Sequence, residues 1–206
     1  GILMGGVAGI VPCEITILGS GIAACAAARS ASGLGATVRV FDNDVYRLRS
    51  AMRELGSTVI GSALHPHVLE GALRSADVVI ATPMRHTVVI GTDLVGVMKR
   101  KVIVVDATIV HGQVFPSLPV VDLGRGCNPS DGDGRKCLCN VSGRVPRTAA
   151  MAVSNALVTL FDDIIAGAGT GSAAGLIRML PGVQPAVFSI MGKIVNAQMA
   201  SSIGTR

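Results

Sequence analysis

The residues of this chain with the clearest chemical use are a glycine turn and an acid. One apolar run leads into the turn Gly19-Ser20-Gly21, and the next apolar run ends on Asp42. The spacing between Gly19 and Asp42 is close to the roughly 20 residues that separate such a turn from a ribose-binding acid. Gly19 allows a tight turn, Gly21 lets the backbone approach a ligand, and the small Ala24 allows close packing of helix and strand. The first amides of the following helix attract negative charge. The pattern predicts that a pyrophosphate rests on this turn and that Asp42 binds the adenosine ribose of a dinucleotide.

Alternating strands and helices must position these residues. Strand-like runs are expected at 14–19, 37–41, 57–60, 77–81 and 102–107, with helical patterns between them at 21–33, 44–55, 66–75 and 92–99. Because the Val and Ile runs are continuous, the strands should form a parallel sheet buried on both faces. Right-handed crossovers make the predicted fold class α/β, a doubly wound parallel (Rossmann) sheet. A glycine-rich turn in another doubly wound domain, such as a methyltransferase, is the alternative.

The remainder of the chain predicts a C-terminal helical extension. Residues 109–147 are dense in Pro, Gly, Asn and Asp, which indicates turns and loops around one short strand at Lys136 to Cys139. Pro146 suits the first turn of a long helix from Arg147 to about Ala166, and a last helix is expected at 185–199. The glycine-rich start, 1–13, is typical of a linker from a preceding domain. The domains are therefore a Rossmann domain at 14–146 and an extension at 147–206.

Composition narrows the function. Only 15% of the 206 residues are charged and 50% are hydrophobic, against about 25% charged in an average domain, so a partner should cover apolar surface. Uncharged stretches are too short to span a bilayer, and no membrane span is expected. The net charge of +5 is spread along the chain, with clusters only at 99–101 and 135–136, and there is no Trp. Nucleic-acid binding, which needs a basic stripe with aromatic platforms, is not expected.

The cysteines and histidines give no metal or catalytic prediction. Five cysteines without a signal peptide indicate free thiols in a reducing cytoplasm. Three of them, Cys127, Cys137 and Cys139, lack both a CxxC pair and a fourth ligand at zinc-like spacing. All four histidines are expected to be surface residues: His65, His67, His86 and His111.

Several segments resemble one family. FDNDVYRLRS at 41–50 and NVSGRVPRTAAMAVSNAL at 140–157 are similar to the alanine dehydrogenase and pyridine-nucleotide transhydrogenase family, most of all to the alanine dehydrogenases. The resemblance extends from GGVAGIVP near the start, through GLGATVRVFD, SADVVIA and MKRKVIVVD, to GVQPAVFSIMGKIVN near the end. It covers nearly the whole chain.

The resemblance implies a cofactor, a reaction and an assembly. It implies an NAD domain flanked by a discontinuous substrate domain, with 1–13 as the linker from a missing N-terminal part and 147–206 as the returning segment. The implied reaction is hydride transfer between NAD and L-alanine or pyruvate plus ammonia. Homo-oligomers, often hexamers, in the cytoplasm are implied too. NAD is expected rather than NADP, because Asp42 would repel a ribose 2′-phosphate.

The resemblance also assigns residues to the cofactor. Gly19, Ser20, Gly21 and Ile22 match the phosphate turn and Asp42 the ribose acid, while Arg47 matches a basic residue near the adenosine and Asn140 an Asn near the nicotinamide. Other roles stay open for two of them, since Arg47 could be a solvated helix residue and Asn140 a turn residue before Gly143. Asp44 is expected to cap the helix that follows it.

One departure puts catalysis in question. Val110 stands where the family has an active-site Asp, and it can neither carry a charge nor accept a hydrogen bond; Pro116 also replaces an acid, and Gly112 alone remains of a glycine pair. Catalytic residues of this chain are therefore unknown. Two alternatives follow: a non-catalytic nucleotide-binding or interaction module, and a transhydrogenase-like domain that exchanges hydride with a second nucleotide.

Overall fold

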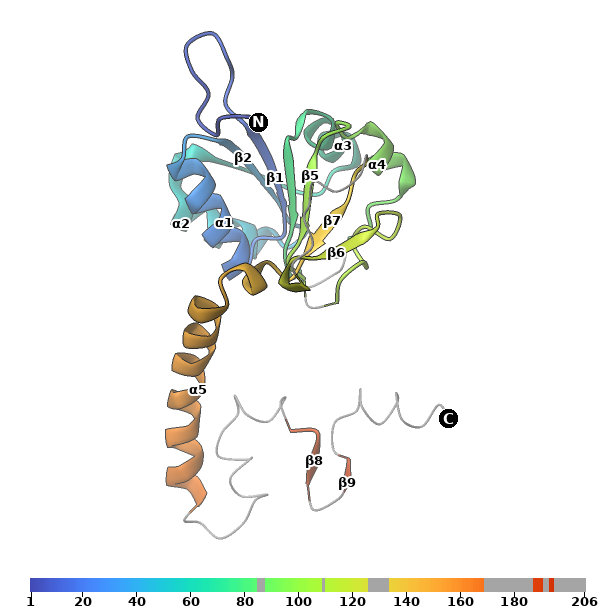
Figure 1. Cartoon of the computed structure of the whole chain (residues 1–206). Coiled ribbons are helices and arrows are strands. Elements are labelled where there is room, and N and C mark those ends of the chain that lie inside the picture. The colour runs from blue at the N-terminus through green and yellow to red at the C-terminus, as the bar shows by residue number, and fades with distance from the viewer. Residues whose placement is uncertain (85–87, 109, 126–133, 169–186, 191–192, 195–206) are drawn as a thin grey trace. The chain divides into compact units, whose positions relative to one another are not determined.

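The computed structural model divides the chain into two units, Gly1–Arg144 and Val145–Arg206. It describes residues 1–84, 88–108, 110–125, 134–168, 187–190 and 193–194. The first unit holds a seven-stranded sheet whose strand pairs are all parallel, in the order β3-β2-β1-β4-β5-β7-β6 (Figure 1). The predicted doubly wound α/β fold is confirmed.

The elements of the first unit follow the predicted alternation closely. They are β1 (Glu14–Leu18), α1 (Ile22–Gly33), β2 (Thr37–Phe41), α2 (Val45–Leu55), β3 (Val59–Ser62), α3 (Pro66–Ser75), β4 (Val78–Ala81), α4 (Thr92–Val97), β5 (Ile103–Asp106), β6 (Val120–Asp122) and β7 (Cys137–Cys139), with 3₁₀ turns η1 (Gly56–Thr58), η2 (Leu123–Arg125) and η3 (Val141–Arg144).

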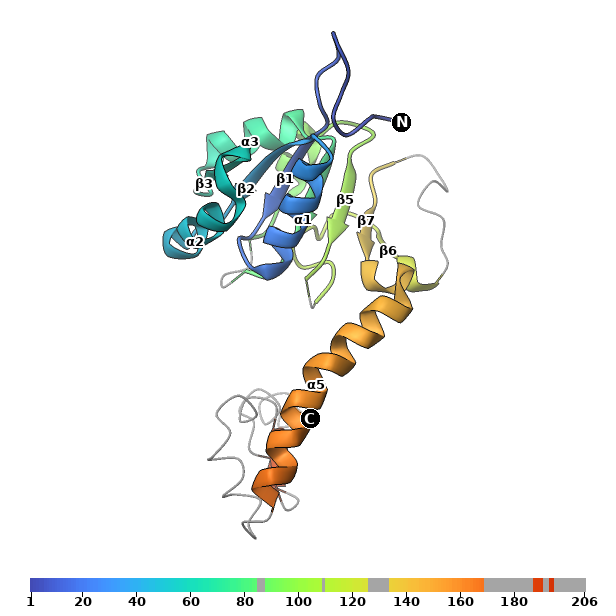
Figure 2. The ribbon, with the colours of Figure 1, turned by 90° about the vertical axis from the view of Figure 1, so that its left-hand side faces the viewer.

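Two apolar cores cover the two faces of the sheet. On one face, Ala24, Ala28 and Ala31 of α1 pack with Ile17 and other residues of the central strands. On the other, side chains of α3 and α4 pack against the opposite side of β1, β4 and β5, as the two views of Figures 1 and 2 show. The alanines allow the helix to approach the sheet closely, so the turn that joins β1 to α1 is held between two rigid elements.

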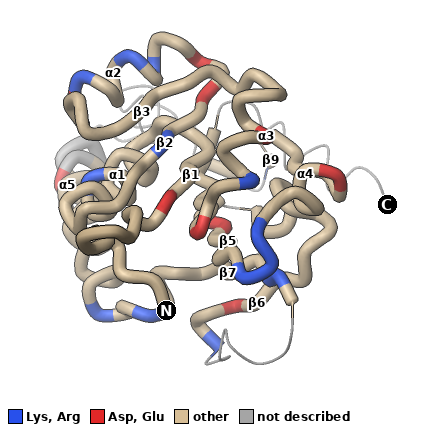
Figure 3. The backbone as a smooth tube through the Cα atoms, turned by 90° about the horizontal axis from the view of Figure 1, so that it is seen from above, with Lys and Arg blue, Asp and Glu red and all other residues tan. Residues whose placement is uncertain are grey.

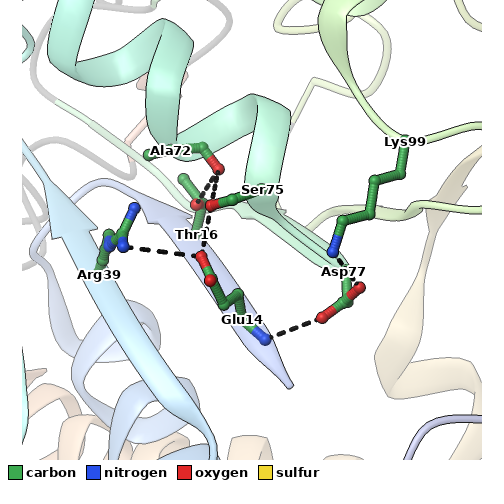
Figure 4. A network of polar contacts seen from close by, with 7 residues as sticks. All are labelled: Glu14, Thr16, Arg39, Ala72, Ser75, Asp77 and Lys99. Atoms are coloured by element: carbon green, nitrogen blue, oxygen red, sulfur yellow. Dashed lines mark hydrogen bonds and ion pairs between the residues drawn. The ribbon is translucent and has the colours of Figure 1, made fainter. Parts of the chain in front are cut away.

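A polar network closes the amino-terminal edge of the sheet (Figure 4). The backbone N–H of Glu14 donates to Asp77 Oδ2 at 3.0 Å, and Lys99 Nζ donates to Asp77 Oδ1 at 2.6 Å. Burial acts to raise the pKa of Asp77, but the bonds from Lys99 and Glu14 outweigh it and hold the pKa below its usual value. The network joins the starts of β1 and β4, opposite the edge that carries the glycine turn.

Figure 3 shows Lys and Arg on several separate elements, α2 among them, with most residues uncharged. Arg135 joins the basic run at 99–101, since its guanidinium donates to Lys99 O and Met98 O. Among the described residues, no helix combines the length and apolar character needed to cross a bilayer.

The second unit confirms one prediction and corrects another. Helix α5 (Pro146–Ala168) matches the long helix predicted from Pro146. The helix predicted at 185–199 is wrong where the structure describes it, because β8 (Ser189–Ile190) pairs antiparallel with β9 (Lys193–Ile194). Each of these short strands ends on an isoleucine, Ile190 or Ile194, and β-branched residues favour strands.

The loop-rich stretch before α5 holds one strand that the sequence did not predict. The short strand β6 (Val120–Asp122) forms the sheet edge beside β7, with Val121 opposite Leu138. Only three residues long and directly after Pro119, β6 is too short to show a pattern, and proline is typical just before an edge strand.

Candidate functional site

The glycine turn between β1 and α1 has the geometry that a dinucleotide site requires. Gly19 has φ of 101°, which side chains rarely adopt, and a Cβ there would overlap Thr82 Oγ1. Gly21 is the N-cap of α1, with φ of −80°. A Cβ at Gly21 would lie 3.0 Å from Arg47 Nη2 and 3.7 Å from Pro83 O. Gly19 is thus needed for the turn itself, whereas Gly21 leaves room for the end of Arg47 in front of the helix.

The amino terminus of α1 has no side-chain cap. Its N-cap is Gly21, which has no side chain to accept from the first turn, and no acidic residue lies in that turn. In α2 the same position is capped, since Asp44 Oδ1 accepts from the backbone N–H groups of Tyr46 and Arg47, each at 3.1 Å, as predicted for Asp44. Uncapped first-turn amides together with the helix dipole favour an anion. Of these two helices, α1 is the one prepared for a phosphate.

Asp42 follows β2 and lies against the glycine turn. Its side chain is buried. Asp42 Oδ2 accepts from the backbone N–H of Ser20 at 2.8 Å and from Ser20 Oγ at 2.6 Å, and Asp42 Oδ1 accepts from the N–H of Asp44 at 2.9 Å. Two carboxylate oxygens offer about four acceptor positions. Three are filled, so the position left for a ligand hydroxyl is on Oδ1.

Three carboxylates end strands in the same way along this edge. Asp42 follows β2, and Asp106 and Asp122 are the last residues of β5 and β6; each accepts from the backbone N–H two residues further on, those of Asp44, Thr108 and Gly124 at 2.9, 2.9 and 2.8 Å. Such Asx turns fix the direction in which the chain leaves a strand. They shape the loops at the carboxyl edge of the sheet, where ligands of open α/β folds bind.

Arg47 and Ile22 flank the turn differently. Arg47, half-buried on α2, brings its guanidinium beside Gly21. Ile22 begins α1 and is 92% exposed. An apolar side chain so exposed at the turn is available to cover a ligand, and it takes no part in the core.

A cavity adjoins the turn on its other side. It has a volume of about 170 Å³ and is lined by residues from the loops after β4 and β5: Thr82, Pro83, Met84, Thr108, Val110, Gln113 and Val114. Thr82 also lies against Gly19, and Pro83 O faces Gly21. The cavity is smaller than a typical ligand site, so it suits one ring of a larger molecule whose remainder lies along the edge.

Val110 lies at this cavity, on a loop organised by Asp106. Asp106 is fully buried; its Oδ1 accepts from Thr108 N and Oγ1, and its Oδ2 accepts from Gly112 N at 3.0 Å. The sequence prediction missed Asp106, although an acid directly after the Val and Ile run of β5 is the signal that identified Asp42. Val110 is 55% exposed and brings an apolar side chain to this wall.

Asn140 follows β7 in a left-handed conformation, with φ of 54°. Its Nδ2 donates to Asp122 Oδ1 at 2.9 Å, and its Oδ1 accepts from Ser142 Oγ at 3.3 Å. Asn140 is therefore tied to the end of β6 as well as forming the turn before Gly143. The sequence prediction did not include Asp122.

The described cysteines are buried thiols, and one of them, Cys25, donates through Sγ to Ser20 O of the glycine turn at 4.0 Å. Cys13, Cys25, Cys137 and Cys139 are free and buried, and burial, helped by the charge of Asp106, raises the pKa of Cys137 to about 12. These thiols therefore stay protonated. Where the structure describes the chain, no three His, Cys, Asp or Glu side chains are grouped to hold a metal ion.

Three of the four histidines lie where the sequence placed them. His65, His67 and His111 are exposed, as predicted. His86 and Cys127 lie outside the described residues.

Comparison with known protein families shows to which family this chain belongs. The model of the family "Alanine dehydrogenase/PNT, C-terminal domain" matches residues 1–197. The chain belongs to this family. The predicted family and its NAD-binding Rossmann domain are therefore confirmed.

Individual relatives agree with the family match. The alanine dehydrogenase of Mycobacterium tuberculosis is 28% identical over 217 residues, covering 99% of this chain and 55% of that protein. The alanine dehydrogenase of Mycolicibacterium smegmatis is 33% identical over 171 residues, covering 75% of this chain and 43% of that protein. The chain thus spans about half the length of the curated relatives it matches.

Solved structures share the fold. An L-alanine dehydrogenase superposes with a TM-score of 0.76 at 23% identity, covering 99% of this chain and 56% of the other. A transhydrogenase from Sinorhizobium meliloti gives a TM-score of 0.64 at 20% identity, covering 96% of this chain and 54% of the other. Both similarities extend over almost all of the present chain.

The residues at the carboxyl edge fit the cofactor of this family. Without a Cβ, Gly21 leaves only the end of Arg47, at 3.0 Å, and Pro83 O, at 3.7 Å, near the place where one would stand. The first amides of α1 have no N-cap side chain, and Asp42 accepts three of the about four hydrogen bonds that its carboxylate can accept. These groups match, in order, the close approach, the negative charge and the hydroxyls of a dinucleotide.

Proposed function

We propose that this chain is the NAD-binding portion of an alanine dehydrogenase-like oxidoreductase. The observation that carries the proposal is the pairing of an uncapped α1 with a buried Asp42 beside the Gly19–Gly21 turn. In this arrangement the α1 amides hold the pyrophosphate and Asp42 Oδ1 accepts from an adenosine ribose hydroxyl. The guanidinium of Arg47, beside Gly21, adds positive charge next to the pyrophosphate.

The nicotinamide half lies further along the same edge. The cavity by Thr82 and Val110 is of a size for one ring, and Asn140 provides an amide at the end of β7. Bound NAD supplies the hydride acceptor or donor, while the protein orients it and keeps water from the ring. The substrate carboxylate clamp and the acid/base group come from the part of the subunit that precedes this chain.

The domain organisation and assembly belong to the same proposal. Residues 1–13 link the domain to an N-terminal substrate domain, residues 14–146 bind NAD, and 147–206 return to the substrate domain. Large apolar side chains of α5 are exposed in the chain alone: Met151, Val153, Val158, Phe161 and Ile165. Such side chains are normally covered, which supports association with the rest of the subunit or with further subunits. The proposed assembly is a homo-oligomer in the cytoplasm, a hexamer by resemblance to the family.

Two measurements test the proposal. Calorimetric titration of the chain with NADH should show binding at one site per chain. Alanine-dependent reduction of NAD should then appear when the N-terminal portion is supplied with the chain. Absence of NADH binding by the folded chain would contradict the proposed NAD site, and with it the whole proposal.

Val110 favours a second candidate, a non-catalytic nucleotide-binding module. Its side chain, 55% exposed at the cavity wall, can neither bind a ribose hydroxyl nor take part in proton transfer. Such a module would bind NADH in the first measurement and give no turnover in the second. The two measurements therefore separate the candidates.

A further inference from the structure

Asp122 lies where it controls which atoms Asn140 offers to a ligand. A carboxylate can only accept hydrogen bonds, so the 2.9 Å contact between Asp122 Oδ1 and the Asn140 amide requires Nδ2 on that side. Asn140 Oδ1 then faces away from Asp122, with Ser142 Oγ as a donor at 3.3 Å. The amide nitrogen carries a second N–H, but Nδ2 lies against Gly124 and Gly143, where a Cβ on either glycine would crowd it. Oδ1 accepts one bond and has a second lone pair, so it is the amide atom that a ligand can reach.

Glycines at two strand ends make room for this pair. A Cβ at Gly124, in η2, would overlap Asn140 Nδ2 and lie 3.2 Å from Asp122 Oδ1, and a Cβ at Gly143, in η3, would lie 2.6 Å from Gly124 Cα. The two turns therefore touch backbone to backbone around the amide. Gly124 N also donates to Asp122 Oδ1 at 2.8 Å, which fixes the carboxylate that in turn fixes the amide.

Asp122 remains ionised over the range in which the protein would work. The bond from Asn140, followed by that from Gly124, lowers the pKa of Asp122 below its usual value. Asn140 adopts the left-handed backbone conformation, with φ of 54°, which asparagine tolerates better than most residues.

We propose that Asp122 is a positioning residue that locks Asn140 to present its Oδ1 to the N–H donors of the nicotinamide carboxamide. The inference rests on the proposed NAD site. It adds that Asn140, at the nicotinamide end of that site, distinguishes one ring substituent from another. A site with a locked acceptor should prefer a carboxamide to an acetyl group, because the acetyl carbonyl has no N–H to donate and places a methyl against Asn140.

The test compares three ligands by calorimetry: NAD⁺, its 3-acetylpyridine analogue, and ADP-ribose, which lacks the ring. Wild type should bind NAD⁺ about tenfold more tightly than the acetylpyridine analogue, the effect of about one hydrogen bond. In Asp122→Ala the amide is free to rotate and donate to the acetyl carbonyl. The preference should fall to about twofold, while ADP-ribose binding is unchanged.

Asp122→Asn separates acceptor from charge. An Asn side chain at this position keeps one oxygen that can accept from both Gly124 and Asn140, so this variant should retain the tenfold preference. The matched control is Asp93→Ala, which removes an exposed acid from the first turn of α4 and should leave all three affinities at wild-type values.

Each outcome separates this inference from the proposed function. If ADP-ribose and NAD⁺ both fail to bind wild type, the NAD site is wrong and the inference falls with it. If both bind and Asp122→Ala keeps the tenfold preference, or Asp122→Asn loses it, the locking role alone is overturned. Should Asp122→Ala not fold, Asn140→Ala replaces it, and a preference retained there overturns the proposal equally.

Discussion

Replacement of Asp42 by Asn removes the acceptor that the ribose needs and leaves the glycine turn supported. One amide oxygen at this position can accept both bonds from Ser20, at present 2.8 and 2.6 Å long. The amide nitrogen then occupies the place of Oδ1, facing the N–H of Asp44. The change thus affects the oxygen proposed to bind the ribose, together with the negative charge.

The magnitudes follow from these contacts. Loss of the Asp44 bond at a buried site should cost about 1–3 kcal/mol in the free energy of unfolding. Loss of a charged acceptor should weaken NADH binding about tenfold, the low end for a hydrogen bond to an ionised group. The affinity for NADPH should rise relative to that for NADH, because the variant no longer repels the ribose 2′-phosphate. Two unit charges about 4 Å apart repel by roughly 4 kcal/mol near a protein surface. The ratio of the NADPH and NADH dissociation constants should fall at least tenfold.

The assay is fluorescence titration of both nucleotides into wild type and variant, with thermal unfolding to confirm the fold. Asp93→Asn, the same chemical change at an exposed position on α4, controls for the loss of one charge. An Asp42→Asn protein that is folded and shows the wild-type ratio would refute the ribose assignment.

Three further changes test other parts of the account. Gly21→Val should lower NADH affinity at least 100-fold with little change in Tm, since φ of −80° suits valine and the nearest contact is the end of Arg47; equal affinity by titration would exclude the pyrophosphate placement. Asp77→Asn should cost about 1 kcal/mol of unfolding free energy at pH 7, because its bond to Lys99 is partly exposed. The lowered pKa of Asp77 means that this contribution is present above about pH 4 and is lost as pH falls through the lowered value. The unfolding free energies of wild type and variant, measured with urea, should therefore converge towards pH 2. A difference that stays constant with pH would contradict the role given to the Asp77 carboxylate. Val110→Asp, in a subunit completed with its N-terminal portion, should raise alanine-dependent NAD reduction at least tenfold, and an unchanged rate would count against the alignment of this loop.

Much of the fold was predictable from local patterns. The Val and Ile runs of β1 and β2, the alanines of α1 and the spacing of Gly19 and Asp42 all indicate the same strand-turn-helix unit, and the structure has each within one or two residues of its expected bounds. Local propensity and tertiary packing agree there.

The errors fall where local pattern is weak. Strand β6 has three residues and is a strand because β7 lies beside it, which no local signal reports. A helix was expected at 185–199, but Ser189 and Ile190 pair with a neighbouring strand.

Side-chain pairing was the hardest part of the site to predict. An acid after a β-branched run indicates a strand end, yet only the structure shows that Asp42 is held by Ser20, that Asp106 organises the loop of Val110, and that Asp122 holds Asn140. These contacts join residues on different strand ends or loops, so they depend on sheet order and register rather than on spacing along the chain.

A crystal structure of the chain with NADH tests the central claim most directly. It should show the pyrophosphate on the first amides of α1 in front of Gly21, and an adenosine ribose hydroxyl within hydrogen-bond distance of Asp42 Oδ1. A nucleotide bound elsewhere, or a ribose that does not touch Asp42, would contradict the account.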